Sequence, residues 1–159
     1  MPVYQREVRV DAPFDEVWDF HSRIAGLEAL TPGWMNLRIE SVTGPDGEAD
    51  PDVLEVGARA VSSVRPFDVG PRQEWTSVIT AREENDGAAY FRDEMEGGPF
   101  RHWEHTHSFF ADNGGTLIRD RVEYQLPLGQ LGEAVGPLAR AGLEPMFRFR
   151  HRKTRELLE

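Results

Sequence analysis

The stretch Phe100-Arg-His-Trp-Glu-His-Thr-His-Ser-Phe-Phe110, together with its continuation Thr116-Leu-Ile-Arg-Asp-Arg-Val-Glu-Tyr-Gln-Leu126, decides the fold. In both segments large apolar residues alternate with polar ones, which is the pattern of a β-strand with one buried face. Between them, Asp112-Asn-Gly-Gly115 has the composition of a tight turn. The two segments therefore predict an antiparallel hairpin.

The turn also predicts how the two strands align. If Ala111 pairs with Thr116, every second residue of one strand faces a residue of the other, and these side chains all share one face. That face is mostly apolar, so we expect it to point toward the interior. The expected partners are Phe109 with Ile118, His107 with Asp120, His105 with Val122, and Trp103 with Tyr124.

The rest of the chain indicates one α+β domain over residues 1–159. Two short helices are predicted at residues 14–20 and 24–30, just after the first strand. Period-two alternation and turn residues between the segments predict about seven strands in an antiparallel sheet. Their expected ranges are residues 3–10, 37–41, 58–64, 73–82, 89–95, 100–111 and 116–126.

The last segment, residues 130–158, predicts a long amphipathic helix. Pro145 lies inside it and is expected to kink or break it. A curved sheet that wraps such a helix buries it on the concave face, and an imperfect fit leaves a central hydrophobic cavity. The apolar positions, at steps of three and four, are Leu131, Val135, Leu138, Gly142, Met146 and Phe149.

Composition excludes several classes of function. The 159 residues contain 28 Asp and Glu against 18 Lys and Arg, a net charge of −10. This balance argues against general nucleic-acid binding and against an anionic membrane surface. There is no cysteine, so thiol chemistry is excluded, and no apolar run approaches the ~20 residues of a membrane span. We expect a cytoplasmic protein without membrane insertion and without a cofactor; the sequence does not indicate an oligomeric state.

The predicted inner face carries a few polar groups among bulky aromatic ones. These groups are Asp93, His105, His107, Asp120 and Tyr124. A buried carboxylate needs a partner, and His107 opposite Asp120 supplies one, which should raise the pKa of the histidine. Three interpretations stay open: a satisfied buried polar pair, contact with a ligand, or acid–base catalysis with His107, Asp120 and His105 as catalytic residues.

A mostly apolar concave surface with few polar groups is typical of a small-molecule pocket. His105 and His107, with Asp93 or Asp120 as third ligand, could also hold a metal, but two histidines at this spacing are a weak signal and no metal is predicted. The predicted ligand-binding residues are Trp34, Trp75, Phe91, Asp93, Trp103, His105, His107, Phe109, Tyr124, Met146 and Phe149.

Several segments together resemble the START-related, polyketide cyclase/dehydrase-like (SRPBCC) superfamily. They are Val10-Asp-Ala-Pro-Phe-Asp-Glu-Val-Trp18, Phe91-Arg-Asp-Glu-Met-Glu-Gly-Gly-Pro-Phe100, His102-Trp-Glu-His-Thr-His-Ser-Phe109 and residues 115–127. The resemblance implies a helix-grip fold, in which a seven-stranded sheet grips a C-terminal helix over a hydrophobic cavity. Members bind lipids, sterols, polyketides or plant hormones, and some cyclise polyketides; no catalytic motif is common to all of them.

Three hypotheses for function follow. The first is binding of an apolar or aromatic, lipid- or polyketide-like molecule in the cavity. The second is a cyclase, dehydrase or hydrolase, with His107 as acid or base, Asp120 orienting it, and His105 or Tyr124 polarising a substrate oxygen. The third is an interaction module for a larger complex, because five cations and two anions give residues 148–159 a net charge of +3, which could dock on an acidic partner.

Overall fold

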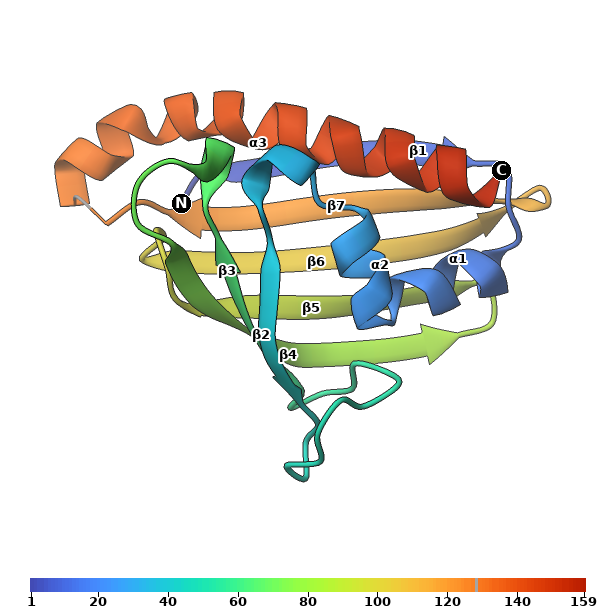
Figure 1. Cartoon of the computed structure of the whole chain (residues 1–159). Helices are drawn as coiled ribbons and strands as arrows, with labels where there is room; N and C mark the ends of the chain where they lie inside the picture. The colour runs from blue at the N-terminus through green and yellow to red at the C-terminus, as the bar shows by residue number, and fades with distance from the viewer. Residues whose placement is uncertain (128) are drawn as a thin grey trace.

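The computed structural model describes the backbone of residues 1–127 and 129–159 and the side chains of residues 1–127 and 140–159. Seven strands form one antiparallel sheet in the order β1-β7-β6-β5-β4-β3-β2. The sheet is strongly curved, and β2 and β3 run across the direction of β5–β7 (Figure 1). The strands are β1 (Val3–Val10), β2 (Arg38–Thr43), β3 (Arg59–Val64), β4 (Gln73–Asn85), β5 (Ala88–Gly97), β6 (His102–Asp112) and β7 (Gly115–Gln125).

Helices cover the concave side of this sheet. The long helix α3 (Gly129–Leu158) lies along β1 and β7, while α1 (Phe14–His21) and α2 (Ile24–Ala29) connect β1 to β2 (Figure 1). Two single 3₁₀ turns, η1 (Gly33–Met35) and η2 (Pro66–Asp68), contact each other. In the described part of the chain, no helix combines the length and apolar character needed to span a membrane.

The predicted helix-grip architecture is confirmed, as are all four predicted partner pairs of the β6–β7 hairpin and the pairing of Ala111 with Thr116. The predicted break at Pro145 is wrong, because α3 is one helix from end to end. Buried Leu143, Phe147 and Thr154 on either side of the proline anchor the helix to the sheet and stabilise its continuation. The apolar positions at residues 131, 135 and 138 have side chains outside the described residues.

The core consists of two apolar clusters that lie at opposite ends of β6 and β7. One gathers Trp18 of α1 with Phe91, Phe109 and Ile118 of the sheet. The other gathers Tyr4, Trp103, Tyr124 and Phe147 with their neighbours, and so joins the sheet to α3. His105, His107 and Asp120 occupy the positions between the clusters, still on the inner face and still buried.

A polar contact ties β1 to α3 beside the second cluster. The Tyr4 hydroxyl donates to Glu144 Oε2 at 2.6 Å, and Arg6 Nη1 donates to Glu144 Oε1 at 2.9 Å. Tyr4 is fully buried, whereas the Glu144 side chain is 39% exposed. The helix is thus held at this point by a charge-assisted hydrogen bond as well as by apolar packing.

We expect Tyr4→Phe to lower the free energy of unfolding by about 1–2 kcal/mol, because it removes a hydrogen bond to a carboxylate and keeps the ring. Urea denaturation at neutral pH measures this. Glu7→Gln, which breaks the exposed Arg119–Glu7 ion pair on the same strand, is the matched control and should cost less than about 0.5 kcal/mol. Equal stability of Tyr4→Phe and the wild-type protein would contradict the role assigned to this contact.

Candidate functional site

A cavity of about 440 Å³ lies between the sheet and helices α2 and α3. Its wall is mostly apolar and is built from β3–β6, both short helices and the segment of α3 around residue 146. The strong curvature of the sheet creates this space: β3 and β4 line one side of it and α3 lines the other. Figure 1 shows how β3 crosses the direction of β5–β7.

Most of the predicted ligand-binding residues line this cavity, and four do not. The lining residues are Trp75, Phe91, Asp93, Trp103, His105, His107 and Met146. The alternation of side chains along each strand explains this agreement, because all the sheet residues in this list lie on the inner face. Trp34, Phe109, Tyr124 and Phe149 lie elsewhere.

The packing of each of these four residues explains why it lies outside the cavity. Phe109 is fully buried against Trp18, with ring centroids 5.3 Å apart, and Tyr124 is buried in the second cluster near Phe100. Phe149 is two residues after the buried Phe147 and therefore points about 200° away around the helix. Trp34 is 46% exposed and stacks on Phe67, so it belongs to the outer surface of η1.

Asp120 is the centre of a buried polar network. His105 Nε2 donates to Asp120 Oδ1 at 2.8 Å, and His151 Nε2 donates to Asp120 Oδ2 at 2.5 Å. His107 lies between two carboxylates, with Nδ1 3.0 Å from Asp120 Oδ1 and Nε2 3.0 Å from Asp93 Oδ2. An ionised carboxylate can only accept, so both nitrogens of His107 act as donors when both carboxylates are charged.

This geometry shifts the pKa of each partner. Burial alone would raise the pKa of Asp93 and Asp120, but hydrogen bonds from the histidines lower it, and for Asp120 they lower it well below its usual value. Burial would lower the pKa of His107, yet Asp120 and Asp93 raise it. Burial and the neighbouring His107 lower the pKa of His105. The network therefore favours a neutral His105 beside a protonated His107.

The sequence prediction of a His107–Asp120 pair was incomplete, because it missed His151. No role was predicted for this residue from the sequence. The signal was present in the spacing: Leu143, Phe147, His151 and Thr154 are four, four and three residues apart, and all are buried on one side of α3. His151 thereby links α3 to Asp120 on β7.

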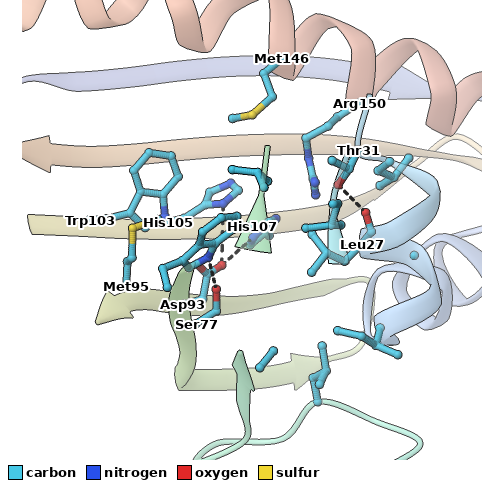
Figure 2. Close-up of a pocket in the computed structure, with 18 of the residues that line it drawn as sticks. Leu27, Thr31, Ser77, Asp93, Met95, Trp103, His105, His107, Met146 and Arg150 are labelled. Carbon is cyan, nitrogen blue, oxygen red and sulfur yellow. Dashed lines mark hydrogen bonds and ion pairs between the residues drawn. The ribbon is translucent and has the colours of Figure 1, made fainter. Parts of the chain in front are cut away.

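Two further cavity residues were not predicted from the sequence. Arg150 extends from α3 into the cavity (Figure 2), and burial lowers the pKa of its guanidinium. Among residues 1–127 and 140–159, nothing hydrogen-bonds or ion-pairs with that guanidinium; its ring contact is with Phe147 at 6.0 Å. His21 also lines the cavity, and burial lowers its pKa to about 3, so it is neutral near pH 7.

One cluster on the cavity wall has the donor atoms of a metal site. Asp93, His105 and His107 each offer one ligand atom, and these atoms lie within 4.8 Å of one another. Figure 2 shows the three side chains together on the sheet side, with Arg150 and Met146 reaching toward them from α3. The wall can therefore contact a ligand, transfer a proton, or coordinate a cation.

Solved structures similar to this chain share its architecture. The protein TTHA0849 of Thermus thermophilus is 20% identical, with a TM-score of 0.62 and coverage of 99% of this chain and 100% of its own. A START superfamily protein of Mycobacterium smegmatis is 16% identical, with a TM-score of 0.63 and coverage of 98% of both chains. Norcoclaurine synthase of Thalictrum flavum, a point mutant with a transition-state analogue, is 19% identical, with a TM-score of 0.65 and coverage of 99% and 93%. At these identities the likeness concerns the fold.

No curated protein sequence matches the chain. The family model described as "Polyketide cyclase / dehydrase and lipid transport" matches residues 10–148, which span strands β2–β7, both short helices and most of α3. The predicted resemblance to the START-related superfamily is confirmed. The chain belongs to the polyketide cyclase/dehydrase and lipid transport family.

Proposed function

We propose that the protein binds an apolar or aromatic small molecule inside the cavity. The observation that carries this proposal is a mostly apolar space of about 440 Å³ within a fold whose family is described by cyclase, dehydrase and lipid-transport activities. Ligand pockets typically measure about 300–1,000 Å³ and combine apolar walls with few polar groups. Trp75, Phe91 and Trp103 supply aromatic surface for a flat ligand.

Arg150 indicates which polar group the proposed ligand carries at one end. A guanidinium in an apolar cavity loses hydration, and it lacks a hydrogen-bonding partner in the described part of the chain. A ligand oxygen, and above all a carboxylate, replaces the lost water through charge-assisted hydrogen bonds. The proposed ligand is therefore a hydrophobic molecule with an oxygen-bearing end group directed at Arg150.

A second candidate function is catalysis at the same wall. His105 and His107 line the cavity. Asp120 contacts both histidines but does not line the cavity itself. In this candidate His107 acts as acid or base, Asp120 orients it, and Arg150 polarises a substrate oxygen in place of Tyr124, which lies outside the cavity. The chemistry is proton transfer next to a carbonyl group, as a cyclase or dehydrase requires.

The interaction-module hypothesis has less support. Arg152, Lys153 and Arg155 face Glu156 and Glu159 along the same helix, at 3.9, 3.7 and 3.1 Å. The net charge of +3 already counts both glutamates, so these contacts leave it unchanged; Arg150, one of the five cations, lines the cavity and is therefore less available to a partner protein.

Gly142 offers a direct test of the binding site. It lines the cavity from α3, and a Cβ added there meets no atom within 4 Å. Gly142→Leu should therefore fill part of the cavity and weaken binding of the fluorescent probe 1-anilinonaphthalene-8-sulfonate by about tenfold. The same change should stabilise the helix by about 0.5–1 kcal/mol, so lost binding cannot result from unfolding.

Gly142→Ala is the matched control, because it gives the same helix stabilisation with little added volume. We expect it to bind the probe like the wild-type protein while melting at a higher temperature. If Gly142→Leu bound the probe as tightly as Gly142→Ala, the probe would occupy another place and the cavity proposal would lose its basis.

The role of Arg150 is tested with two ligands of similar shape, 2-naphthoate and uncharged 2-methylnaphthalene. Arg150→Met should weaken naphthoate binding by about 10- to 100-fold, the range expected for a charge-assisted hydrogen bond, and leave methylnaphthalene binding unchanged. Titration calorimetry measures both. Arg148→Met, at an exposed position one half-turn earlier, should change neither affinity; equal losses in both variants would refute the assignment.

The catalytic candidate predicts exchange of the methyl protons of 2-acetylnaphthalene with deuterium, faster than in buffer, followed by NMR in D₂O. His107→Ala should abolish the exchange and retain ligand binding, since the protonated ring donates to the carbonyl oxygen and so promotes loss of a methyl proton to water, but only lines part of the wall. His102→Ala, on the same strand and outside the cavity lining, serves as the control. An exchange rate that His107→Ala leaves intact would exclude His107 as the acid.

A further inference from the structure

The side chains of Asp93, His105 and His107 form a convergent donor set on the cavity wall. Asp93 and His105 are directly paired across β5 and β6, and His107 follows two residues later on the same face. Asp93 Oδ2 lies 3.0 Å from His107 Nε2 and 3.7 Å from His105 Nδ1. All three side chains are at most 15% exposed and border the cavity.

The far nitrogen of each histidine is already engaged. His105 Nε2 and His107 Nδ1 both lie at Asp120 Oδ1, at 2.8 and 3.0 Å, and His151 holds the other oxygen of Asp120. Metal-binding histidines usually have their second nitrogen fixed by a carboxylate in this way, because it orients the ring and strengthens the donor. Asp120 and His151 thus aim His105 Nδ1 and His107 Nε2 at the same space.

His105 shows that this space suits a cation. Its Nε2 carries the proton donated to Asp120, so a neutral ring presents a lone pair at Nδ1. That lone pair faces Asp93 Oδ2, another acceptor, at 3.7 Å. Two acceptors that face each other without a hydrogen between them are stabilised by a positive ion placed between them.

We propose that Asp93, His105 and His107 bind a divalent first-row transition metal, with Asp120 and His151 as positioning residues. Two imidazoles and one carboxylate suit zinc or iron rather than calcium or magnesium, which prefer oxygen donors. The metal takes the place of the proton on His107 Nε2, which leaves to solvent. The side toward the cavity keeps positions open for water or a ligand oxygen.

Charge supports this assignment. Before a metal binds, Asp93 and Asp120 balance Arg150 and the protonated His107, and binding of the ion displaces one proton. A divalent ion turns this into one positive charge, which an anionic oxygen of a ligand or a hydroxide balances. The proposal does not depend on which organic molecule the cavity holds, and it can be tested without one.

The test uses the full chain, purified without a histidine tag, stripped with a chelator and titrated with Co²⁺. We expect one equivalent to bind, with visible d–d absorption, and the melting temperature to rise because the metal binds the folded state. His107→Gln and Asp93→Asn should lose the absorption band, whereas His102→Ala should keep it. Asp120→Asn and His151→Gln should bind one equivalent about 10- to 100-fold more weakly, as expected when a group that orients a ligand is lost.

Several outcomes would overturn the proposal. The stripped protein could fail to bind Co²⁺, or the band could persist unchanged in both His107→Gln and Asp93→Asn. Equal losses in His102→Ala would likewise assign the metal to another place. Circular dichroism of each variant confirms that it folds, and probe binding to metal-free protein reports separately on the cavity, so the two proposals fail independently.

Discussion

The rest of the site depends on one buried carboxylate, that of Asp120. It lies on β7, accepts from His105 and His151, and contacts His107, so it joins the sheet to α3 through polar contacts in an otherwise apolar interior. A buried charge of this kind is tolerated only when its partners are held in place, because an unpaired carboxylate in the core is costly. The carboxylate therefore requires both the register of β6 and β7 and the position of α3.

This requirement explains why the cavity has two unlike sides. The side near Asp120 is polar, tightly hydrogen-bonded and fixed by groups from three elements. The other side consists mostly of apolar side chains from β3, β4 and α2. Arg150 reaches into the cavity from α3, and within the described residues its guanidinium has no hydrogen-bond or ion-pair partner. The two proposed activities, proton transfer and binding of an apolar molecule, therefore fall on different walls of the cavity.

The sequence predicted the sheet side of the site well, because strand parity and a short turn determine which residues face inward. The pairs from Phe109–Ile118 to Trp103–Tyr124 are all found. Strand alternation shows which residues face inward, but it does not distinguish residues that line a cavity from those that fill the core. Phe109 and Tyr124 were therefore predicted to contact a ligand, although they lie in the core clusters. That distinction depends on which neighbours cover each ring, such as Trp18 over Phe109.

The helix side was harder to predict. The apolar stripe predicted through Met146 and Phe149 lies on a different side of α3 from the buried residues, which include Phe147 and His151. A charged segment at a chain end ordinarily indicates a solvated surface, and nothing local distinguishes Arg150 or His151 from Arg148 or Arg152. Their roles depend on how α3 packs against the sheet, which the local sequence does not show.

The register of the β6–β7 hairpin has a consequence for how this protein can change over evolutionary time. Insertion of a single residue in β6 would turn Thr106 and Ser108 inward in place of the histidines, and an insertion in β7 would turn Arg119 inward in place of Asp120. Point substitutions on the outer positions leave the inner face untouched, whereas insertions and deletions in the strands destroy it in one step. Descendants of this sequence can therefore vary freely in surface composition and in cavity size, but only at constant strand length.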